Sequence, residues 1–437
     1  MGRSLTVLIT LAVLLVAAAA IVVLPQSGAE ELRAGGGLRW YRGNMHTHSH
    51  WSDGDDYLEM IADWYRTNGY QFLVFTDHNV LADAERWVTV DRTKGKRRAY
   101  DKLKARFADW IEERGVGADL EVRLRTFDEV AERFNEPGEY LLIQGEEISD
   151  KFGNYPIHLN ASNVQELIPP LGGGSVSETI QNNVNAVIAQ RERTGRPMIP
   201  HLNHPNFGYA VRAEDLIPIV GEKFFEVYNG HPLVHNHGDH IHASTERIWD
   251  VVLAFRLGKL GLPVMYGLAT DDGHDYHDHG PKDAIPGRGW VQVLAAELTP
   301  AALIEALEAG RFYASSGVLL KSVVSSPRGL SVEVDSVPGE SYTIEFIGTR
   351  KDFDRTTTPL TGDQGEALHT TGRYSDDIGQ VLATTRGTKA AYTFTGDELY
   401  IRARVTSDAK LPHPSEPGDV KQAWCQPVVG PGALVTE

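Results

Sequence analysis

The chain has 437 residues, of which 41% are hydrophobic and 23% charged, a composition that indicates a soluble globular protein and excludes a disordered or collagen-like chain. This length accommodates one large core and a second, smaller domain. The formal net charge of −17 argues against nucleic acid as a partner, because phosphate backbones are bound by basic surfaces. This net charge does not exclude a small anionic substrate bound at a metal site, because the local charge there outweighs the charge of the whole chain.

The N-terminal residues carry a targeting signal. Leu5 to Leu24 form an uncharged apolar run that follows Arg3. We interpret residues 1–29 as either a cleaved secretory signal or a single membrane anchor formed by residues 5–24. The protein is therefore expected to be exported, periplasmic or extracellular, and to touch a membrane only through this segment. Cys425 is the single cysteine, so no intramolecular disulfide can form.

After a linker over residues 30–39, strand and helix patterns alternate. Apolar residues at helical spacing predict helices over residues 55–69, 175–194, 244–258 and 299–310, and Ser175 and Thr299 suit the N-caps of the second and the last of these. Apolar runs predict strands over 72–75, 140–145, 198–202, 224–228, 262–269 and 290–295. Strands separated by helices imply parallel neighbours with right-handed crossovers, and these units suffice to close a barrel over residues 40–320.

The pattern changes in the last part of the chain. From Lys321 onward the helical period fades, and short β-rich runs separated by turn signals appear. We expect a small antiparallel β domain over residues 321–437. It contains two histidines, His369 and His413, which favours a packing or positioning role over a catalytic one.

The other histidines of the chain, all between His46 and His279, fall largely into short clusters that follow strand-like runs. The clusters are His46-Thr47-His48, Ser52-Asp53-Gly54, Thr76-Asp77-His78-Asn79, Gly145-Glu146-Glu147, His158-Leu159-Asn160, His201-Leu202-Asn203-His204 and Asp272-Gly273-His274. Ligands delivered from the ends of successive strands are typical of barrel metallohydrolases. Mixed nitrogen and oxygen ligands without thiolate favour Zn, Mn or Fe.

Individual positions suggest more specific roles. Asp77 could hold an imidazole in one tautomer or be a ligand itself. Glu146 and Glu147 point to opposite faces of a strand, so at most one of them enters the barrel mouth easily. His231 is the best candidate for substrate contact among the loop histidines between residues 231 and 242, which otherwise predict a solvated loop. We expect Asp77, His201 and His231 to serve catalysis.

The ordered clusters resemble those of the PHP (polymerase and histidinol phosphatase) family, over residues 40–320. His158-Leu159-Asn160, Glu226-Val-Tyr-Asn-Gly230 and Gly310-Arg-Phe-Tyr-Ala-Ser-Ser-Gly317 resemble more narrowly its CehA/McbA-type branch. The resemblance implies a distorted seven-stranded β/α barrel with two or three divalent metals at its C-terminal mouth. In that arrangement His46, His48, Glu147 and Asp272 hold one metal. Glu147 bridges to a second held by His158 and His204, and Asp53, His78 and His274 hold a third.

Metals that share a bridging carboxylate lower the pKa of a shared water and so generate a nucleophile. The commonest chemistry of the resembled family is phosphoester hydrolysis, which is the first expectation here. A basic stretch supports an anionic small-molecule substrate, although the solvated face of a helix explains it as well. It comprises Arg92, Lys94, Lys96, Arg97, Arg98, Lys102, Lys104 and Arg106.

Three other functions stay open. The CehA/McbA resemblance allows a carbamate, ester or amide hydrolase with the same metals. An amidohydrolase-type barrel also begins with a His-x-His motif, but Asp272-Gly273-His274 and Thr76-Asp77-His78-Asn79 belong to the other pattern. A metal-binding or carbohydrate-binding envelope protein without activity is the non-enzymatic alternative, and the intact ligand set argues against it.

Overall fold

The computed structural model describes residues 30–434, so the predicted signal or anchor lies outside the described part of the chain. Among the described residues, none of the helices combines the length and the apolar character that a bilayer crossing requires.

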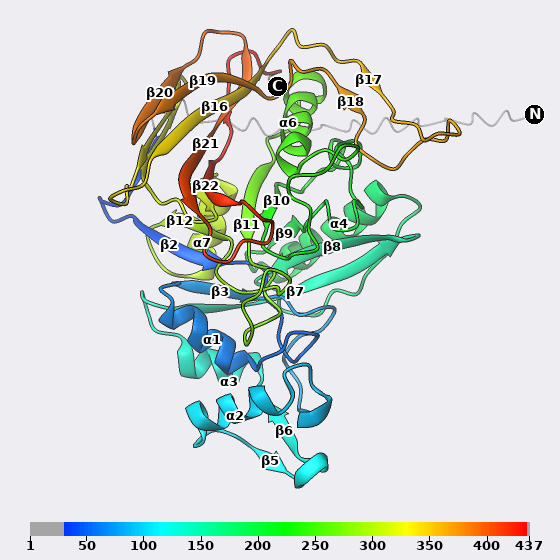
Figure 1. Ribbon diagram of the computed structural model, residues 1–437, viewed down its shortest axis with the longest axis vertical. Helices are drawn as coiled ribbons and strands as arrows, with labels where there is room; N and C mark the ends of the chain where they lie inside the picture. The colour runs from blue at the N-terminus through cyan, green and yellow to red at the C-terminus, as the bar shows by residue number, and fades with distance from the viewer. Residues whose placement is uncertain (1–29, 435–437) are drawn as a thin grey trace, which may run out of the picture.

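Seven strands close into a distorted barrel (Figure 1). They are β2 (Arg39–Asn44), β3 (Phe72–Phe75), β7 (Leu141–Phe152), β8 (Tyr155–Ser162), β9 (Ile199–Leu202), β10 (Phe224–Asn229) and β11 (Tyr266–Thr270), and they pair in the order β11-β10-β9-β8-β7-β3-β2. The ring closes beyond the strand ends, where Thr47 forms a parallel bridge with Gly273 and the His48 amide donates to the Gly273 carbonyl at 3.0 Å. The predicted α/β class is thereby confirmed.

The expectation that all neighbouring strands run parallel is wrong in two places. β8 pairs antiparallel with both β7 and β9. The cause is a tight hairpin at Gly153, whose φ of 59° lies in the left-handed region that glycine adopts without strain. β12 (Trp290–Ala295) also runs antiparallel to its neighbour β2, and it leads the sheet out of the barrel.

Helices cover the barrel much as the sequence predicts. They are α1 (Leu58–Thr67), α4 (Val176–Thr194), α5 (Ala213–Leu216), α6 (Thr245–Phe255), which continues into a π-helical turn over Arg256–Leu260, and α7 (Pro300–Glu308). The predicted N-caps Ser175 and Thr299 are present, and Ser244 caps α6 in the same way. Each of these side chains accepts a hydrogen bond from the backbone amide three residues later.

An insertion between β3 and β7 forms a separate lobe at the lower end of Figure 1. It contains the small antiparallel sheet β4 (Arg86–Thr89), β6 (Glu121–Leu124), β5 (Glu113–Arg114), the helices α2 (Lys96–Phe107) and α3 (Phe127–Phe134), and the short turns η1 (Val90–Arg92) and η2 (Gly117–Asp119).

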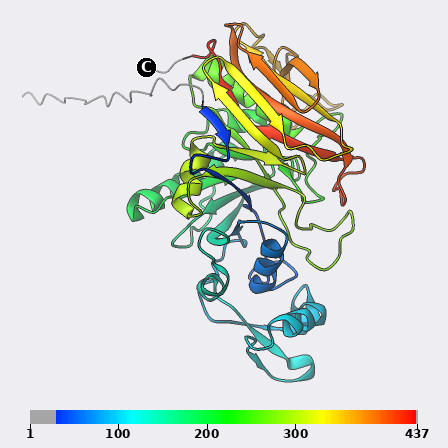
Figure 2. The same cartoon turned by 90° about the vertical axis from the view of Figure 1, so that its left-hand side faces the viewer.

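The C-terminal strands lie at the opposite end of the molecule from this insertion (Figures 1 and 2). The main sheet continues from β12 through β13 (Phe312–Ser315), β22 (Val420–Cys425), β21 (Glu398–Lys410), β16 (Tyr342–Arg350) and β19 (Gln380–Arg386), with β23 (Val428–Val429) beside β21. A second sheet joins β1 (Glu30–Arg33), β14 (Leu320–Ser326), β15 (Gly329–Val334) and β20 (Lys389–Thr393), and β17 (Thr357–Thr358) pairs with β18 (Arg373–Tyr374). Part of the expected linker is thus a strand, β1. The main sheet continues without a break from β13 to β22, so the domain boundary at residue 320 stays a prediction.

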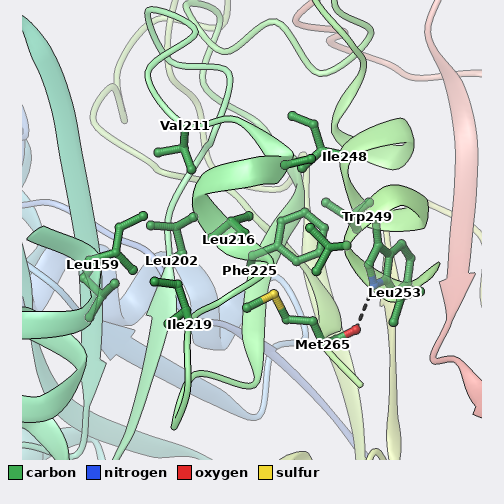
Figure 3. Close-up of a cluster of buried hydrophobic side chains, with 14 of the residues drawn as sticks. Leu159, Leu202, Val211, Leu216, Ile219, Phe225, Ile248, Trp249, Leu253 and Met265 are labelled. Carbon is green, nitrogen blue, oxygen red and sulfur yellow. Dashed lines mark hydrogen bonds between the residues drawn. The ribbon is translucent and has the colours of Figure 1, made fainter. Parts of the chain in front are cut away.

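Side-chain alternation on the barrel strands separates the core from the candidate site. On β10, Phe225 and Val227 face outward and pack against the helices, where Trp249 donates a hydrogen bond to the Met265 carbonyl at 2.8 Å (Figure 3). Phe224 faces inward into an apolar cluster that fills the barrel floor, and Glu226 follows on the same inner face. The barrel is therefore apolar at its floor and polar at its mouth.

Candidate metal centre

Glu147 occupies the middle of the barrel mouth and has no exposed surface. Its two carboxylate oxygens lie within 3.5 Å of ring nitrogens of five histidines, one on β8 and the others in the segments that follow β2, β3 and β9. These distances are 3.5 Å to His46 Nε2, 3.3 Å to His48 Nε2, 2.7 Å to His78 Nδ1, 3.0 Å to His158 Nδ1 and 3.5 Å to His204 Nε2. One buried carboxylate is thus surrounded by imidazoles, the arrangement that a ligand shared between cations requires.

The neighbouring Glu146 points the other way, as strand alternation demands. Its carboxylate accepts a hydrogen bond from the Ile168 amide at 2.9 Å on the outside of the barrel. Burial raises the pKa of Glu146 to about 8. Burial also opposes ionisation of Glu147, but the charges of His78 and His158 outweigh it and hold the Glu147 pKa well below its ordinary value.

Asp272 joins the first part of the cluster. Its Oδ1 atom lies 3.2 Å from both His46 Nε2 and His48 Nε2, and its Oδ2 atom lies 4.0 Å from His204 Nε2. The Asp272 backbone has a φ of 51°, a left-handed conformation that a non-glycine residue adopts at a cost and that is common at functional sites. This turn directs the carboxylate back over the end of β11.

A second group lies at the solvent edge of the mouth. Asp53 Oδ1 is 3.3 Å from His274 Nε2, 3.6 Å from His78 Nε2 and 3.8 Å from His48 Nδ1. The Asp53 side chain is 58% exposed, whereas that of His48 is fully buried. His48 therefore stands between the two groups, with one ring nitrogen towards each.

His158 reaches the same mouth from the reversed strand. Because β8 runs against β7, the beginning of β8 and not its end lies at the mouth, where His158 pairs with Ser149 in the β7–β8 ladder. All nine predicted metal ligands are thus brought together, in overlapping groups of three or four potential ligand atoms lying within 4.8 Å of one another.

Unpartnered polar atoms show that this cluster suits cations. In the described part of the chain, His46 Nε2, both ring nitrogens of His48, Glu147 Oε2 and His158 Nδ1 are buried without a hydrogen-bond partner. Native interiors leave few such atoms, since each one loses its hydration without compensation. A divalent cation would use these lone pairs as ligands, so the residues present fit the predicted metals.

Glu226 completes the centre, and sequence reasoning assigned it no role. Its Oε1 atom accepts from His46 Nδ1 and Thr270 Oγ1, both at 2.8 Å. Its Oε2 atom accepts from the His204 amide and Asn229 Nδ2, also at 2.8 Å. A carboxylate that holds Nδ1–H of a histidine leaves Nε2 free to bind metal and fixes the ring orientation.

Two amides act on the carboxylates in a similar way. Asn203 Nδ2 donates to Glu147 Oε1 at 2.7 Å, and Asn229 Nδ2 donates to Asp272 Oδ2 at 3.1 Å. The signal for Asn203 and Asn229 was available in the sequence, because both belong to motifs recognised there. Nothing in the spacing shows which atoms they contact.

Asp77 has a different role from the two that the sequence suggested. Its Oδ1 atom accepts from the Ser49 amide, the Ser52 amide and Ser52 Oγ, and its Oδ2 atom accepts from Ser49 Oγ, over distances of 2.6–3.1 Å. These contacts fix the turn that carries Asp53, so Asp77 holds no imidazole and its carboxylate is fully used by the turn.

His201 and His231 lie beside the cluster in different ways. His201 is buried one layer below the mouth, with Nε2 at 3.4 Å from Glu226 Oε1, and burial lowers its pKa. His231 lies at the mouth, and its ring centroid is 5.4 Å from that of His274. Its Nδ1 atom accepts from the Leu233 amide at 3.1 Å, and burial lowers its pKa to about 4. A neutral His231 therefore carries its proton on Nε2.

The rest of the histidine-rich loop is more ordered than a solvated loop. His242 and His235 stack on Tyr209 with ring centroids 3.6 and 5.2 Å away, and His237 Nε2 contacts Asp419 at 2.8 Å. These contacts attach the loop to the barrel and to the C-terminal strands.

Comparison with known proteins gives limited similarity. No family model matches the chain. It is 32% identical over 79 residues to the DNA polymerase/3'-5' exonuclease PolX of Bacillus subtilis (strain 168), a match covering 18% of this chain and only 14% of that relative. Among solved structures, it is similar to a two-domain protein from Bacteroides vulgatus ATCC 8482 described as containing a predicted PHP-like metal-dependent phosphoesterase. That likeness has 15% identity and a TM-score of 0.38, and covers 90% of this chain and 96% of the other. An amidohydrolase from Chromobacterium violaceum is similar over 43% of this chain and 77% of its own, with 13% identity and a TM-score of 0.21. The PHP family stays a prediction for this chain.

Proposed function

We propose that this protein is a PHP-type metal-dependent phosphoesterase that hydrolyses a small anionic substrate outside the cytoplasm. The observation that carries the proposal is the fully buried Glu147 carboxylate surrounded by imidazoles from His46, His48, His78, His158 and His204. The partial similarity to PolX and the ordered motifs support the family.

The ligand groups would be divided as the motifs imply. His46, His48, Glu147 and Asp272 would hold one cation, Glu147 with His158 and His204 a second, and Asp53, His78 and His274 a third. Bound divalent cations supply a water of lowered pKa and positive charge that stabilises the attacked phosphoryl group.

The protein's own groups prepare this chemistry. Glu226 fixes the His46 ring, and the amides of Asn203 and Asn229 hold two of the carboxylates in place. His231 offers an Nε2–H donor at the mouth, because its Nδ1 atom already accepts the Leu233 amide. We assign this donor to the substrate phosphoryl group or to the leaving oxygen.

The test joins metal analysis to a substrate panel. The full chain purified without chelator is analysed for Zn, Mn and Fe, and is then assayed on p-nitrophenyl phosphate, bis(p-nitrophenyl) phosphate, p-nitrophenyl acetate and a p-nitrophenyl carbamate. We expect two or three metals per chain and turnover of the phosphoesters.

The matched controls are Glu147→Gln and Glu146→Gln, which remove adjacent carboxylates on opposite faces of the same strand. Glu147→Gln is expected to lose bound metal and activity, whereas Glu146→Gln keeps both because Glu146 lies outside the cluster. Turnover of the carbamate or acetate alone would replace the proposal with the carbamate, ester or amide hydrolase. Bound metal without turnover on the whole panel would favour the non-catalytic binding protein.

A further inference from the structure

A small pocket lies between the Asp53 turn and the insertion. Ser52 and Gly54 line it from the turn, and Arg86, Arg92 and Lys94 line it from β4 and the segment around η1. Its volume is about 220 Å³. Pockets that enclose a whole drug-sized ligand begin at about 300 Å³, so this one suits a single chemical group of a substrate and not an entire molecule.

The lining is cationic in an acidic protein. Three of its side chains are basic, several others carry hydroxyl groups, and none is acidic, although the whole chain has a net charge of −17. A concentration of one sign of charge against the global sum creates a local potential that attracts the opposite charge.

The structure divides the basic stretch found in the sequence into two parts. Most of its members lie on α2 or beside it and make ion pairs with carboxylates, which is the behaviour of a solvated helix face. These pairs are Lys94–Asp275, Arg97–Asp101, Arg98–Asp278, Lys102–Asp56, Lys104–Glu113 and Arg106–Asp63. Of the stretch, Arg92 and Lys96 have no carboxylate partner among the described residues, and only Arg92 of these two lines the pocket.

Arg86 is also held without a carboxylate. Its Nη1 atom donates to the Trp51 carbonyl at 2.6 Å, and its guanidinium lies 5.6 Å from the centre of the Trp51 ring. These contacts fix the side chain, so its positive charge at the pocket is not neutralised by any described carboxylate. A fixed guanidinium loses little freedom on binding a planar or tetrahedral anion.

His50 forms part of the wall of the pocket. It is only 5% exposed, and it donates from Nδ1 to the Gly54 carbonyl at 2.9 Å. This hydrogen bond ties the His50 ring to the turn that carries Ser52 and Gly54.

The pocket adjoins the candidate metal centre through the backbone. Ser52 and Gly54 line it, while Asp53 between them belongs to the outer metal group. The pocket and the outer metal group therefore share one turn of the backbone, with Asp53 directly between two residues that line the pocket. Asp53 is also the most exposed of the predicted ligands and faces the solvent edge of the mouth.

We propose that this pocket, formed by His50, Ser52, Arg86, Arg92 and Lys94, binds a second anionic group, phosphate or carboxylate, of the substrate whose phosphoester lies at the metal centre. The inference rests on the proposed function for the reaction, and it names the substrate class as phosphoesters that carry a further negative charge a few bonds away.

The experiment uses three substrates with the same three-carbon chain. Propyl phosphate has no second anion, 3-phosphooxypropionate has a carboxylate, and propane-1,3-diol bisphosphate has a second phosphate. The full-length, metal-loaded protein is expected to prefer one or both of the last two by about tenfold or more in kcat/KM, as charge-assisted contacts allow. The preferred one identifies the anion.

Three variants separate the pocket from the general charge of the insertion. Arg92→Ala is expected to reduce the preference about tenfold, chiefly through KM. Arg92→Lys should retain part of it, because the charge stays. Arg97→Ala, which removes an exposed arginine paired with Asp101 on α2, should leave it unchanged.

Binding is also measured without catalysis. Inorganic pyrophosphate is titrated calorimetrically into protein kept in EDTA. Arg92→Ala should raise the dissociation constant for pyrophosphate about tenfold relative to Arg97→Ala. If pyrophosphate binding depends on Arg92 but the protein has no phosphoesterase activity, the proposed pocket is supported and the proposed reaction is rejected. Phosphoesterase activity with no preference among the three substrates, or a preference that Arg92→Ala does not reduce, would overturn the pocket alone.

Discussion

Replacement of Glu226 by glutamine tests whether the candidate centre depends on the carboxylate that orients His46. All four hydrogen-bond partners of Glu226 are donors: His46 Nδ1 and Thr270 Oγ1 at one oxygen, the His204 amide and Asn229 Nδ2 at the other. A glutamine has one oxygen and one NH₂ group. In either orientation its oxygen accepts from two of these donors, and its NH₂ group faces the other two without accepting. Either the His46 ring or the His204 backbone loses its support.

The size of the effect follows from these contacts. Hydrogen bonds to a charged group contribute about 1.5–3 kcal/mol each, so loss of two would lower the free energy of unfolding by about 3–6 kcal/mol before relaxation. The Thr270 hydroxyl can rotate, which reduces this figure, whereas the Asn229 amide is held by its contacts with Asp272 and the His231 amide. Loss of a partner that orients a metal-binding histidine typically weakens metal affinity or activity about 10–100-fold.

The assay is a competition for Zn²⁺ or Mn²⁺ between the protein and a chromophoric chelator, joined to urea unfolding of the metal-free protein. Glu222→Gln is the matched control, since Glu222 is equally buried just before β10 and uses one oxygen to accept the Lys223 and Phe224 amides. Burial raises the Glu222 pKa well above its ordinary value, which favours the neutral carboxyl that glutamine resembles in shape.

We expect Glu226→Gln to lose about 10–100-fold in metal affinity and Glu222→Gln to change it less than about twofold. Wild-type metal affinity in Glu226→Gln would refute the reasoning, because the four donors would then have tolerated an amide. Equal losses in both variants would attribute the effect to strand β10 and not to the His46 contact.

Three further outcomes are expected. Burial raises the pKa of Glu59 from 4.5 to about 7, so the folded protein holds this proton more tightly than the unfolded chain, and stability falls as pH rises between these values. Relative to the wild type, Glu59→Gln should therefore gain up to about 3 kcal/mol in free energy of unfolding at pH 8 and nothing at pH 4. Parallel pH profiles of the two proteins in urea unfolding would contradict this. Asp77→Ala should weaken metal retention and lower stability by about 2–4 kcal/mol, whereas Asp77→Asn should do much less because the Ser49 hydroxyl can turn to accept; equal metal content in all three proteins would count against the turn's role. Phe225→Ala removes a fully buried ring whose centroid is 5.9 Å from that of Trp249 and should cost about 3–5 kcal/mol in urea unfolding, so a loss below about 1 kcal/mol would be inconsistent with the packing shown in Figure 3.

The sequence predicts the fold well wherever a local pattern is decisive. Helices α4, α6 and α7 begin at the residues whose side chains cap them, because Ser and Thr satisfy free amides through contacts only three residues long. The reversal of β8 could not be predicted in this way. Antiparallel pairing of β7 and β8 depends on a two-residue connection at Gly153, and the apolar runs predict no strand over the residues of β8.

The candidate site was predictable to the extent that its residues stand in visible clusters. His46 and His48 directly follow β2, Glu147 lies on β7, and the clusters around residues 78, 204 and 272 follow other strands, so convergence at one mouth follows from the barrel itself. The hydrogen-bond partners of these side chains could not be predicted from the sequence. A hydrogen bond between residues 180 positions apart, such as that from His46 to Glu226, leaves no local pattern.

Glu226 shows why the most informative residue of a site can be the hardest to find. It lies on a fully buried strand, between Phe225 and Val227, so by spacing alone it belongs to the inner face of the barrel. A carboxylate on such a face is stable only if donors surround it, and a chain with a barrel pattern must supply them from other strands. An acidic residue between apolar residues of a buried strand therefore predicts a buried network even when its partners are unknown. In this protein that network orients His46, the first histidine of the candidate metal centre.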